Sequence, residues 1–483
     1  YLNFNAAARE YGKVGGFAHL NTLVKSLRET AGGKDNCLLL DGGDTWQGSA
    51  TAYWTRGKDM VQAANLLGVD VMTGHWEFTY QDDEVLSNVD EFDGEFLAQN
   101  IKLTEDALFE GKHAHDEDTG HVFKPYTLRE LNGHKVAIIG QAFPYTPVAN
   151  PQRFIPDWTF GIRNQDLQEL VDSIKENDKP DAIILLSHNG TDVDLKLASV
   201  VTGIDFILGG HTHDGVPIPV TIKNSGGQTV VTNAGSNGKF VGVLDLQLEK
   251  GKVKGYDYRL LPVFSNFIKA DPEMAALIDT IRKPHIETLN EPLATTESLL
   301  YRRGNFNGTF DQLICDALRH ELNAEISLSP GFRWGTTVLP GQAITFEHVM
   351  DQTCITYPET YARDMLGSEI KAILEDVADN LFHPDPFYQQ GGDMVRVGGM
   401  NYICDPTAAA GNRITQMTLG SGKSIDANKT YKVAGWATVG SKAPGKPIWD
   451  VVASYLRNQK HVNITQVNSP KLLNVNNNPG IVL

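Results

Sequence analysis

Short apolar runs alternate with amphipathic stretches from Lys34 to Leu261, and this alternation limits the possible folds of the chain more than any other feature. Apolar runs of strand length lie at 37–41, 69–72, 135–139, 182–186 and 206–208, and stretches with helical spacing lie at 60–67 and 166–177. A strand, helix, strand order predicts an α/β layered domain with partly parallel sheets. In such sheets, ligands bind at loops just beyond the carboxyl ends of the strands.

The rest of the chain predicts a second domain. The segment 271–289 has helical spacing with few breakers, and we interpret it as a helix that links two domains. Beyond it we expect an α+β domain, with helices at 311–321, 367–381 and 448–457 and strands at 342–345 and 431–434. We therefore place a catalytic domain at 1–265, a linker helix at 266–292 and a substrate-binding domain at 293–483.

The charge balance of the chain argues against some partners. Forty-two Lys and Arg face 59 Asp and Glu, which gives a net charge of −17. Because such a charge repels phosphate, we expect neither nucleic acid nor a membrane as the main partner. No apolar run reaches the roughly 18 residues that a bilayer span needs. An anionic substrate would therefore need local positive charge, from metal ions or a few Arg side chains.

The cysteines and the first residues leave some questions open. Cys37, Cys315, Cys354 and Cys404 have no spacing typical of a metal site or a redox pair. Up to two disulfides are possible, and buried free thiols are an equally good interpretation. The chain begins at Tyr1 in a polar segment without a signal-peptide pattern, and we expect further residues upstream.

Metal-capable side chains follow four of the apolar runs, at the places where strands should end. The four stretches are DGGDTWQGS at 41–49, GHWEF at 74–78, SHNG at 187–190 and GGHTHD at 209–214. Glycines allow a sharp turn after a strand, so that the next side chain points into a cleft. One such stretch is weak evidence, but four of them predict a shared site.

The donors in these stretches are the carboxylate of Asp44 and the imidazoles of His75, His188, His211 and His213. The set contains no thiolate, and it suits Mn, Fe or Zn in a hydrolytic site rather than a structural zinc. A carboxylate can bridge two ions roughly 3.5–4 Å apart, which polarise an oxyanion and activate a water. The pattern predicts a dinuclear hydrolase.

Simpler roles are open for several of these residues. An isolated His75 or His188 is more often a hydrogen-bonded structural histidine, although the clustering of both favours ligation. Asp44 could cap a helix that begins near Gln47, and Asp41 could support its loop instead of binding metal. Within the polar stretch 112–121, which we interpret as a surface loop, we expect solvated imidazoles: His113, His115 and His121.

Taken together, these motifs resemble those of the calcineurin-like metallophosphoesterases, in the two-domain arrangement of the 5'-nucleotidases. The resemblance covers nearly the whole chain. The chain resembles the SoxB thiosulfohydrolases of bacterial sulfur oxidation more closely than the 5'-nucleotidases, because of the variant GHWEF at 74–78. Further SoxB-like stretches lie at 11–19, 41–50 and 54–56. The resemblance implies a four-layer metallophosphoesterase-type sandwich domain of α/β class, followed by an α+β domain of the 5'-nucleotidase C-terminal type.

The resemblance also implies a ligand set for two manganese ions, with Zn or Fe as substitutes. Asp44 would bridge both ions. One ion would be completed by His75, His188 and His211, and His213 would bind the other. In the family, the remaining ligands of that second ion come from an Asp-x-His motif. No Asp-x-His occurs in this sequence, and we expect it before Tyr1.

Trp76 departs from the nucleotidase pattern, which has a His at this position that stabilises the transition state or protonates the leaving oxygen. An indole cannot act as a general acid. A phosphate ester must expel a poorly stabilised alkoxide, whereas a cysteine S-thiosulfonate expels a sulfur anion, which is a better leaving group. We therefore hypothesise a substrate with an S–S bond, and we group Trp76 with Asp44 and His75 as catalytic residues.

The second domain departs from the nucleotidase pattern as well. Nucleotidases carry an aromatic residue followed by Gly-Gly-Asp-Gly that helps to hold the base, and the corresponding stretch 433–440 lacks it, while Gly391–Met394 is a poor substitute.

A loop arginine can clamp sulfonate oxygens with two hydrogen bonds, although an ion pair is an equally good interpretation of Arg333. The candidate substrate contacts are Arg333, Trp334 and Arg363, with Arg302, Arg303 and Asn305 behind them.

The SoxB-like pattern implies a periplasmic hydrolase that acts on a sulfonated cysteine persulfide of the SoxYZ carrier protein and releases sulfate. Two alternatives stay open. One is a 5'-nucleotidase or another phosphoesterase with an altered general acid. The other is a catalytically silent carrier-binding protein with the same fold.

Overall fold

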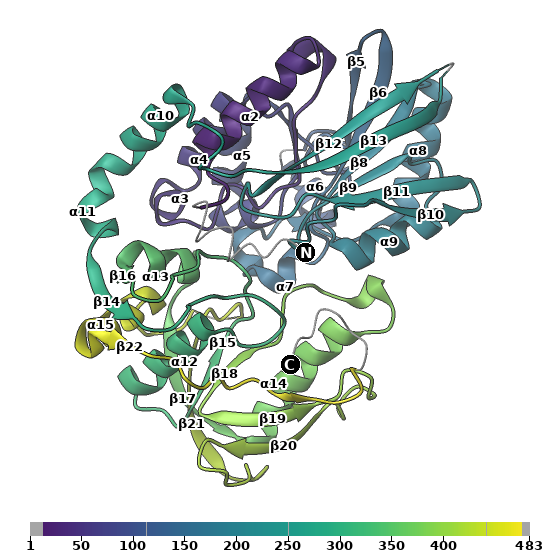
Figure 1. Cartoon of the computed structure of the whole chain (residues 1–483). Coiled ribbons are helices and arrows are strands. Elements are labelled where there is room, and N and C mark those ends of the chain that lie inside the picture. The colour runs from purple at the N-terminus through teal and green to yellow at the C-terminus, as the bar shows by residue number, and fades with distance from the viewer. Residues whose placement is uncertain (1–12, 113, 250, 441, 476–483) are drawn as a thin grey trace. The chain divides into compact units, whose positions relative to one another are not determined.

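The computed structural model describes residues 13–112, 114–249, 251–440 and 442–475. The chain forms two compact units (Figure 1). The first unit runs up to Pro284 without Gly48–Tyr53, and the second comprises Gly48–Tyr53 and the chain from His285 onwards. The division falls within the segment 266–292, for which we predicted a linker helix.

The first unit contains two main sheets. A parallel sheet has the order β1-β2-β3, and a six-stranded sheet has the order β10-β11-β9-β8-β6-β5, with β6, β8, β9 and β11 parallel to one another. Their strands are β1 (Leu40–Asp41), β2 (Val71–Met72), β3 (Glu95–Phe96), β5 (Tyr126–Leu131), β6 (His134–Gln141), β8 (Ala182–Ser187), β9 (Phe206–Gly209), β10 (Val220–Asn224) and β11 (Gly227–Asn233). Two antiparallel pairs complete the set: β12 (Phe240–Leu248) with β13 (Val253–Pro262), and β4 (Lys102–Leu103) with β7 (Trp158–Thr159).

The helices of the first unit cover these sheets. The larger ones are α2 (Phe17–Thr30), α4 (Lys58–Leu67), α5 (Asp82–Glu91), α8 (Asn164–Asn177), α9 (Thr191–Val200) and α10 (Pro272–Arg282). The shorter ones are α3 (Ala50–Thr55), most of which is assigned to the second unit, α6 (Glu105–Phe109) and α7 (Thr146–Ala149). The predicted linker helix is interrupted, because a 3-10 turn at Lys283–His285 separates α10 from α11 (Ile286–Leu289). Pro284 lies in that turn and has no N–H to continue a helix.

Apolar cores separate the layers of the first unit, and the residues of two of them are described. One core joins side chains of β2, β6, β8 and β9 to the β12–β13 ribbon, which crosses the six-stranded sheet in Figure 1. The other core lies under α2, α4 and α5 and contains Trp46, Phe78 and Phe96. Helix α9 packs on the β9, β10 and β11 side of the large sheet. The order helices, sheet, sheet, helices is the predicted four-layer arrangement.

Strand β8 shows why the apolar runs form these sheets. All of its residues from Ala182 to Ser187 are buried, and it pairs with parallel strands on both sides. A strand that is covered on both faces must be apolar throughout, which explains the continuous run in the sequence. The predicted strands at 37–41 and 69–72 are shorter in the structure, where only Leu40–Asp41 and Val71–Met72 pair.

The second unit is an α+β fold. Its central sheet has the order β17-β21-β15-β18, and two smaller sheets have the orders β16-β14-β22 and β20-β19-β23. The strands are β14 (Pro292–Thr296), β15 (Ile326–Ser329), β16 (Ala343–Thr345), β17 (Thr360–Leu366), β18 (Arg396–Gly398), β19 (Met400–Cys404), β20 (Ile414–Leu419), β21 (Thr430–Trp436), β22 (His461–Val462) and β23 (Lys471–Leu472). The larger helices are α12 (Thr309–Glu321), α13 (Phe346–Thr353), α14 (Gly367–Phe382) and α15 (Ile448–Gln459), and the short α11 and most of α3 belong to this unit as well.

One open point from the sequence is answered by the fold. All four cysteines are free thiols, and Cys315, Cys354 and Cys404 are buried, so the free-thiol interpretation applies. Among the described residues, no helix combines the length and the apolarity that a bilayer crossing requires.

Close packing between the two sheets of the first unit gives a test of the fold. A Cβ at Gly140 of β6 would overlap the carbonyl group of Leu97, which follows β3. We expect Gly140→Ala to lower the free energy of unfolding by about 1–3 kcal/mol, because a packed interior resists added atoms. Urea denaturation measures this change. Gly161→Ala is the matched control, since its Cβ would approach only the flexible Arg163 side chain, and equal stability of both variants would contradict the packing.

Candidate metal centre

Four strand ends bring the predicted ligands together. Asp44 follows β1, His75 follows β2, His188 follows β8 and His211 follows β9. Ligand atoms of these four residues all lie within 4.8 Å of one another. Asp44 and His75 follow strands of one parallel sheet, and His188 and His211 follow parallel strands of the other. The strand ends of the two packed sheets lie together, which is why residues as distant in the chain as Asp44 and His188 meet here.

Glu77 fixes the two loops that carry Asp44 and His75. Its buried carboxylate accepts hydrogen bonds from backbone N–H groups of both loops. Oε2 accepts from Asp44 at 3.1 Å and from His75 at 2.7 Å. Oε1 accepts from Thr45 at 2.6 Å and from Trp46 at 3.2 Å. Burial raises the pKa of Glu77, and the nearby charge of Asp44 adds to this effect, while the backbone N–H groups oppose it. One side chain therefore sets the distance between two predicted ligands.

His188 is oriented by a hydrogen bond on each side of its ring. Its Nδ1 lies 2.5 Å from the Gly42 carbonyl oxygen and donates to it, so that Nε2 points to Asp44 Oδ2 at 3.0 Å. Burial lowers the pKa of His188, but the charge of Asp44, its hydrogen bond and the Gly42 carbonyl raise it to about 9. A backbone carbonyl on the far nitrogen is the usual way in which proteins orient a metal-binding imidazole.

His75 and His211 are held by the ring of Phe143. The His75 and Phe143 ring centroids are 4.1 Å apart, and His211 stacks on Phe143 with a centroid distance of 4.2 Å and an interplanar angle of 24°. His75 Nδ1 lies 3.1 Å from Asp44 Oδ1, and burial lowers the pKa of His75 against the opposing effect of that carboxylate. Phe143 follows β6, and its backbone N–H donates to the Gly74 carbonyl oxygen at 3.0 Å.

Unusual backbone conformations concentrate at the predicted ligands. Asp44, His211 and His213 all have positive φ angles, 65°, 68° and 60°. Such conformations cost roughly 1–3 kcal/mol for non-glycine residues and persist where the surroundings fix them, commonly at functional sites. Glycines make the close loop packing possible, since a Cβ at Gly43 would lie 2.7 Å from the Thr73 carbonyl oxygen and one at Gly74 would lie 2.6 Å from Phe96.

The residues present fit a divalent metal ion. Three imidazoles and one carboxylate converge, and His75 and His188 are each only 2% exposed. His75 Nε2 is buried and has no hydrogen-bond partner among the described residues. A buried ring nitrogen without a partner is costly, and a metal ion would satisfy it. Burial raises the pKa of Asp44, but the two imidazoles His188 and His75 lower it well below its usual range, so this ligand is ionised.

Other predicted residues of the first unit lie around this group. His213 is partly buried and does not belong to the convergent set of four. Asp41 accepts the Gly43 N–H at 3.0 Å and the Thr45 hydroxyl at 2.7 Å, so it supports its loop. Asp44 does not cap a helix: α3 begins at Ala50, and the Ser49 hydroxyl accepts the Ala52 N–H. Trp76 is 7% exposed, and its backbone N–H donates to Asp44 Oδ1 at 3.0 Å.

The two described histidines of the 112–121 stretch, His115 and His121, take no part in the convergent group. His115 is exposed, as we expected for a surface loop. His121 is half-buried, and its Nδ1 lies 2.7 Å from the Thr119 hydroxyl. His113 lies outside the described residues.

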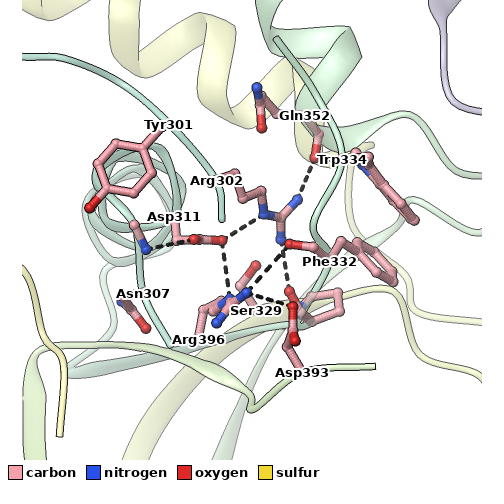
Figure 2. A network of polar contacts seen from close by, with 12 residues as sticks. Tyr301, Arg302, Asn307, Asp311, Ser329, Phe332, Trp334, Gln352, Asp393 and Arg396 are labelled. Atoms are coloured by element: carbon pink, nitrogen blue, oxygen red, sulfur yellow. Dashed lines mark hydrogen bonds and ion pairs between the residues drawn. The ribbon is translucent and has the colours of Figure 1, made fainter. Parts of the chain in front are cut away.

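The candidate substrate residues of the second unit separate into two places. Arg333 and Trp334 lie in the loop after β15, where Arg333 Nη1 is 3.3 Å from Asp393 Oδ1 and Trp334 stacks on Phe332. Figure 2 shows the polar network beside this loop, built from Arg302, Asp311, Asp393 and Arg396. Arg363 is exposed on β17, where its guanidinium stacks on Tyr361, and the structure does not bring it into this network.

Comparison with known proteins identifies the family. The chain is similar over its full length to the sulfate thiohydrolase SoxB of Thermus thermophilus, whose structure was solved with glycerol. The two share 37% sequence identity and superpose with a TM-score of 0.89, and the match covers 100% of this chain and 87% of that chain. The chain belongs to the SoxB family. Residues 291–452 of this SoxB-family chain also match the 5'-nucleotidase, C-terminal domain. The predicted family and fold class are thus confirmed.

More distant relatives include a protein named as a 5'-nucleotidase and one named as a nucleotide phosphoesterase. A 5'-nucleotidase precursor from Thermus thermophilus shares the fold at a TM-score of 0.79 and 22% identity, with 95% of this chain and 94% of that chain covered. Protein UshA of Yersinia enterocolitica is 25% identical, over 91% of this chain and 84% of its own length. The trifunctional nucleotide phosphoesterase YfkN of Bacillus subtilis is 26% identical over 89% of this chain, which spans only 32% of YfkN. The SoxB-family chain therefore belongs to a group of hydrolases.

Sequence reasoning missed Glu77 and Phe143 as residues that organise the centre. Glu77 lies within the GHWEF stretch between two aromatic residues, and an acidic residue in such an apolar place could have indicated a buried backbone acceptor. Phe143 carries no local signal, because its role depends on the end of a strand that is far from His75 along the chain.

Glu77 gives a direct test of the centre. Gln has an amide NH₂ in place of one carboxylate oxygen, so Glu77→Gln would leave backbone N–H groups of the Asp44 or His75 loop without an acceptor. We expect Mn²⁺ affinity to fall about 10- to 100-fold, as for other residues that orient metal ligands. Isothermal titration with Mn²⁺ measures the change, with Glu91→Gln, an exposed partner of Lys58, as the control. Unchanged affinity in Glu77→Gln would show that the loops hold their positions without it.

A buried carboxylate supports the β8 end of the centre. Asp194 is fully buried, and its Oδ1 accepts the Ser187 hydroxyl at 2.7 Å and the Asn189 amide at 3.1 Å. Asn189 in turn accepts from Gln141, which bonds Gln99. Burial raises the pKa of Asp194 to about 7, against the effect of these hydrogen bonds, and Asp194 Oδ2 has no hydrogen-bond partner among the described residues.

Asp194 predicts a pH dependence of stability. Between its ordinary pKa of 3.8 and about 7, the unfolded chain is ionised while the folded chain keeps the proton, so stability falls as pH rises through this range. Asp194→Asn removes this loss. We expect the free energy of unfolding of the variant, taken relative to that of wild type, to rise by roughly 2–4 kcal/mol from about pH 5 to about pH 8. Urea denaturation of both proteins at the two pH values measures this change. A stability difference between variant and wild type that is the same at both pH values would contradict the raised pKa of Asp194.

Proposed function

We propose that this chain is a thiosulfohydrolase that removes the terminal sulfonate of a cysteine S-thiosulfonate on a carrier protein of the SoxYZ type. The observation that carries the proposal is the full-length similarity to a sulfate thiohydrolase at 37% identity, compared with 22–27% for nucleotide hydrolases. The reaction is R–S–S–SO₃⁻ + H₂O → R–S–S⁻ + SO₄²⁻ + 2H⁺. The water oxygen bonds to the oxidised sulfur, and the electron pair of the broken S–S bond leaves with the persulfide.

Trp76 supports an S–S substrate over a phosphate ester. It follows His75 directly, and its indole centroid lies 5.2 Å from the His75 ring, within the candidate metal centre. An indole N–H has no proton to give at neutral pH, so the leaving group must depart as a stable anion. A persulfide anion meets that condition, whereas the alkoxide of a nucleotide needs a proton.

The donors of the centre would hold two divalent ions, which we propose to be manganese. Asp44, His75, His188 and His211 converge for this purpose, and His213 is proposed for the second ion. When bound, the ions would polarise the sulfonate oxygens and lower the pKa of water. The chain's own contribution is geometric: Glu77 holds two ligand loops, and the Gly42 carbonyl fixes the tautomer of His188.

A positively charged cluster in the second unit supports an anionic substrate. Three guanidinium groups, those of Arg302, Arg333 and Arg396, form ion pairs with two carboxylates, those of Asp311 and Asp393. Arg303 is close enough to Arg333 and Asp393 to interact with their charges. Burial lowers the pKa of Arg303, and the neighbouring Arg333 adds to this effect. The excess of positive charge in this cluster favours an anion, and we propose that Arg333 binds an anionic group of the substrate.

We further propose a place of action outside the cytoplasm, in the periplasm, because SoxB-type chemistry belongs to extracytoplasmic thiosulfate oxidation in the family that the motifs resemble. The proposed partner is the carrier protein that presents the modified cysteine. A second candidate function, hydrolysis of nucleotides, is favoured by the 5'-nucleotidase, C-terminal domain match at 291–452 and by the nucleotidase relatives.

Two product assays decide between the candidate functions. We expect the Mn-loaded protein, in a form that includes any residues preceding Tyr1, to release sulfate from thiosulfonate-loaded carrier and no phosphate from AMP. Asp44→Asn should lose metal and sulfate release together, because it removes the shared carboxylate. Asp41→Asn, which alters the loop contacts with Gly43 and Thr45 in the same segment, is the matched control. Phosphate release without sulfate release would refute the proposal and identify a divergent nucleotidase.

A further inference from the structure

The buried network of the second unit is built around the loop that carries Arg333. Arg302 donates to the Pro330 carbonyl oxygen at 2.7 Å, and Arg396 donates to the Phe332 carbonyl oxygen at 3.5 Å, so that two guanidinium groups bond the backbone of this loop. Figure 2 shows both arginines beside Phe332. The loop has no regular secondary structure of its own at these positions, and its path therefore depends on such contacts.

Asp393 connects the network to the side chain of Arg333. Its Oδ2 accepts from Arg396 Nη2 at 3.0 Å, and its Oδ1 lies 3.3 Å from Arg333 Nη1. The Asp393 side chain is fully buried, whereas that of Arg333 retains 18% exposure. Arg396 is itself fixed, because its Nη2 donates to the Gly304 carbonyl oxygen and its Nε lies 3.4 Å from Asp311 Oδ1.

Asp311 anchors the inner end of the network to helix α12. Its Oδ2 accepts the Gly308 N–H at 2.8 Å at the start of that helix, and its Oδ1 accepts Arg302 Nε at 2.6 Å. Asp311, Arg302 and Arg396 have fully buried side chains. A chain of charge-assisted hydrogen bonds and ion pairs therefore runs from a helix start to the partly exposed guanidinium of Arg333.

We infer that Asp393 is a positioning residue that holds the Arg333 guanidinium in the orientation that binds an anionic group of the substrate. The inference rests on the proposed function, in which Arg333 contacts the substrate. An arginine side chain has many rotamers, and ordering it at the moment of binding weakens affinity. Asp393 orders it beforehand through the ion pair between Asp393 Oδ1 and Arg333 Nη1.

A purely electrostatic role for Asp393 predicts the opposite effect. Asp393→Asn removes a negative charge 3.3 Å from Arg333, so the potential around Arg333 becomes more positive and an anion should bind more tightly. If Asp393 positions Arg333, the same substitution releases the guanidinium, and binding weakens. The sign of the change in affinity therefore separates the two roles.

The test compares KM and kcat for a thiosulfonate-loaded carrier in the Mn-loaded protein. We expect Asp393→Asn to raise KM about three- to tenfold, the range for ordering one long side chain, with kcat changed much less. In an Arg333→Ala background, the second substitution should add nothing. Glu375→Gln is the matched control, because Glu375 is a buried carboxylate of the same unit that accepts the Arg413 and Ile414 N–H groups and makes no contact with Arg333 among the described interactions.

Two further measurements keep the inference falsifiable. Titration with thiosulfate, followed by thermal shift, compares wild type, Arg333→Ala and Asp393→Asn without turnover, so it applies even if no sulfate is released and the proposed function fails. Where Asp393→Asn does not fold, Asp393→Ser replaces it, since a hydroxyl can accept from Arg396. Thiosulfate binding to the Asp393 variant that is equal to or tighter than binding to wild type would overturn the inference. So would an equal further loss of affinity when the Asp393 substitution is added to Arg333→Ala. Neither result would bear on sulfate release by wild type.

Discussion

The candidate metal centre depends on the carboxylate of Glu77. Four backbone N–H groups from two loops converge on it, and these loops end two different strands of one parallel sheet. A buried carboxylate is costly unless its oxygens are fully hydrogen-bonded, so the folded state requires both loops in place at once. Asp44 and His75 are therefore located relative to each other before any metal binds.

The opposite side of the centre is organised by neutral groups. The Gly42 carbonyl orients His188, and the ring of Phe143 packs against both His75 and His211. Behind them, a buried series of amides leads from Gln99 through Gln141 and Asn189 to Asp194. Hydrogen bonds link these polar side chains in series, although Asp194 Oδ2 has no partner among the described residues. The series supports ligands with positive φ angles.

The second unit repeats this principle with charges. Arg302 and Arg396 hold the backbone of the Arg333 loop, and Asp393 holds its side chain. The sequence indicated Arg333 as a candidate anion contact. It indicated no role for Asp393, because the stretch Gly391–Met394 was compared only with the nucleotidase pattern. Arg363 was a further candidate in the sequence, and the structure shows it exposed on β17 beside Tyr361. Spacing alone could not separate the two arginines, because their difference lies in contacts between distant segments.

The sequence by itself determined the layered α/β architecture, the family and the chemical identity of the donors. Strand-length apolar runs and the glycine turns after them are local patterns, and local patterns can be read from neighbouring residues. Only the tertiary structure decided that four of the five proposed ligands converge, that Asp41 supports a loop, and that Glu77, Phe143 and Asp393 set the positions of others. These roles come from contacts between residues far apart in the chain, such as Asp44 with His188 across 144 positions, which appear only when separate strands meet at one edge of their sheets.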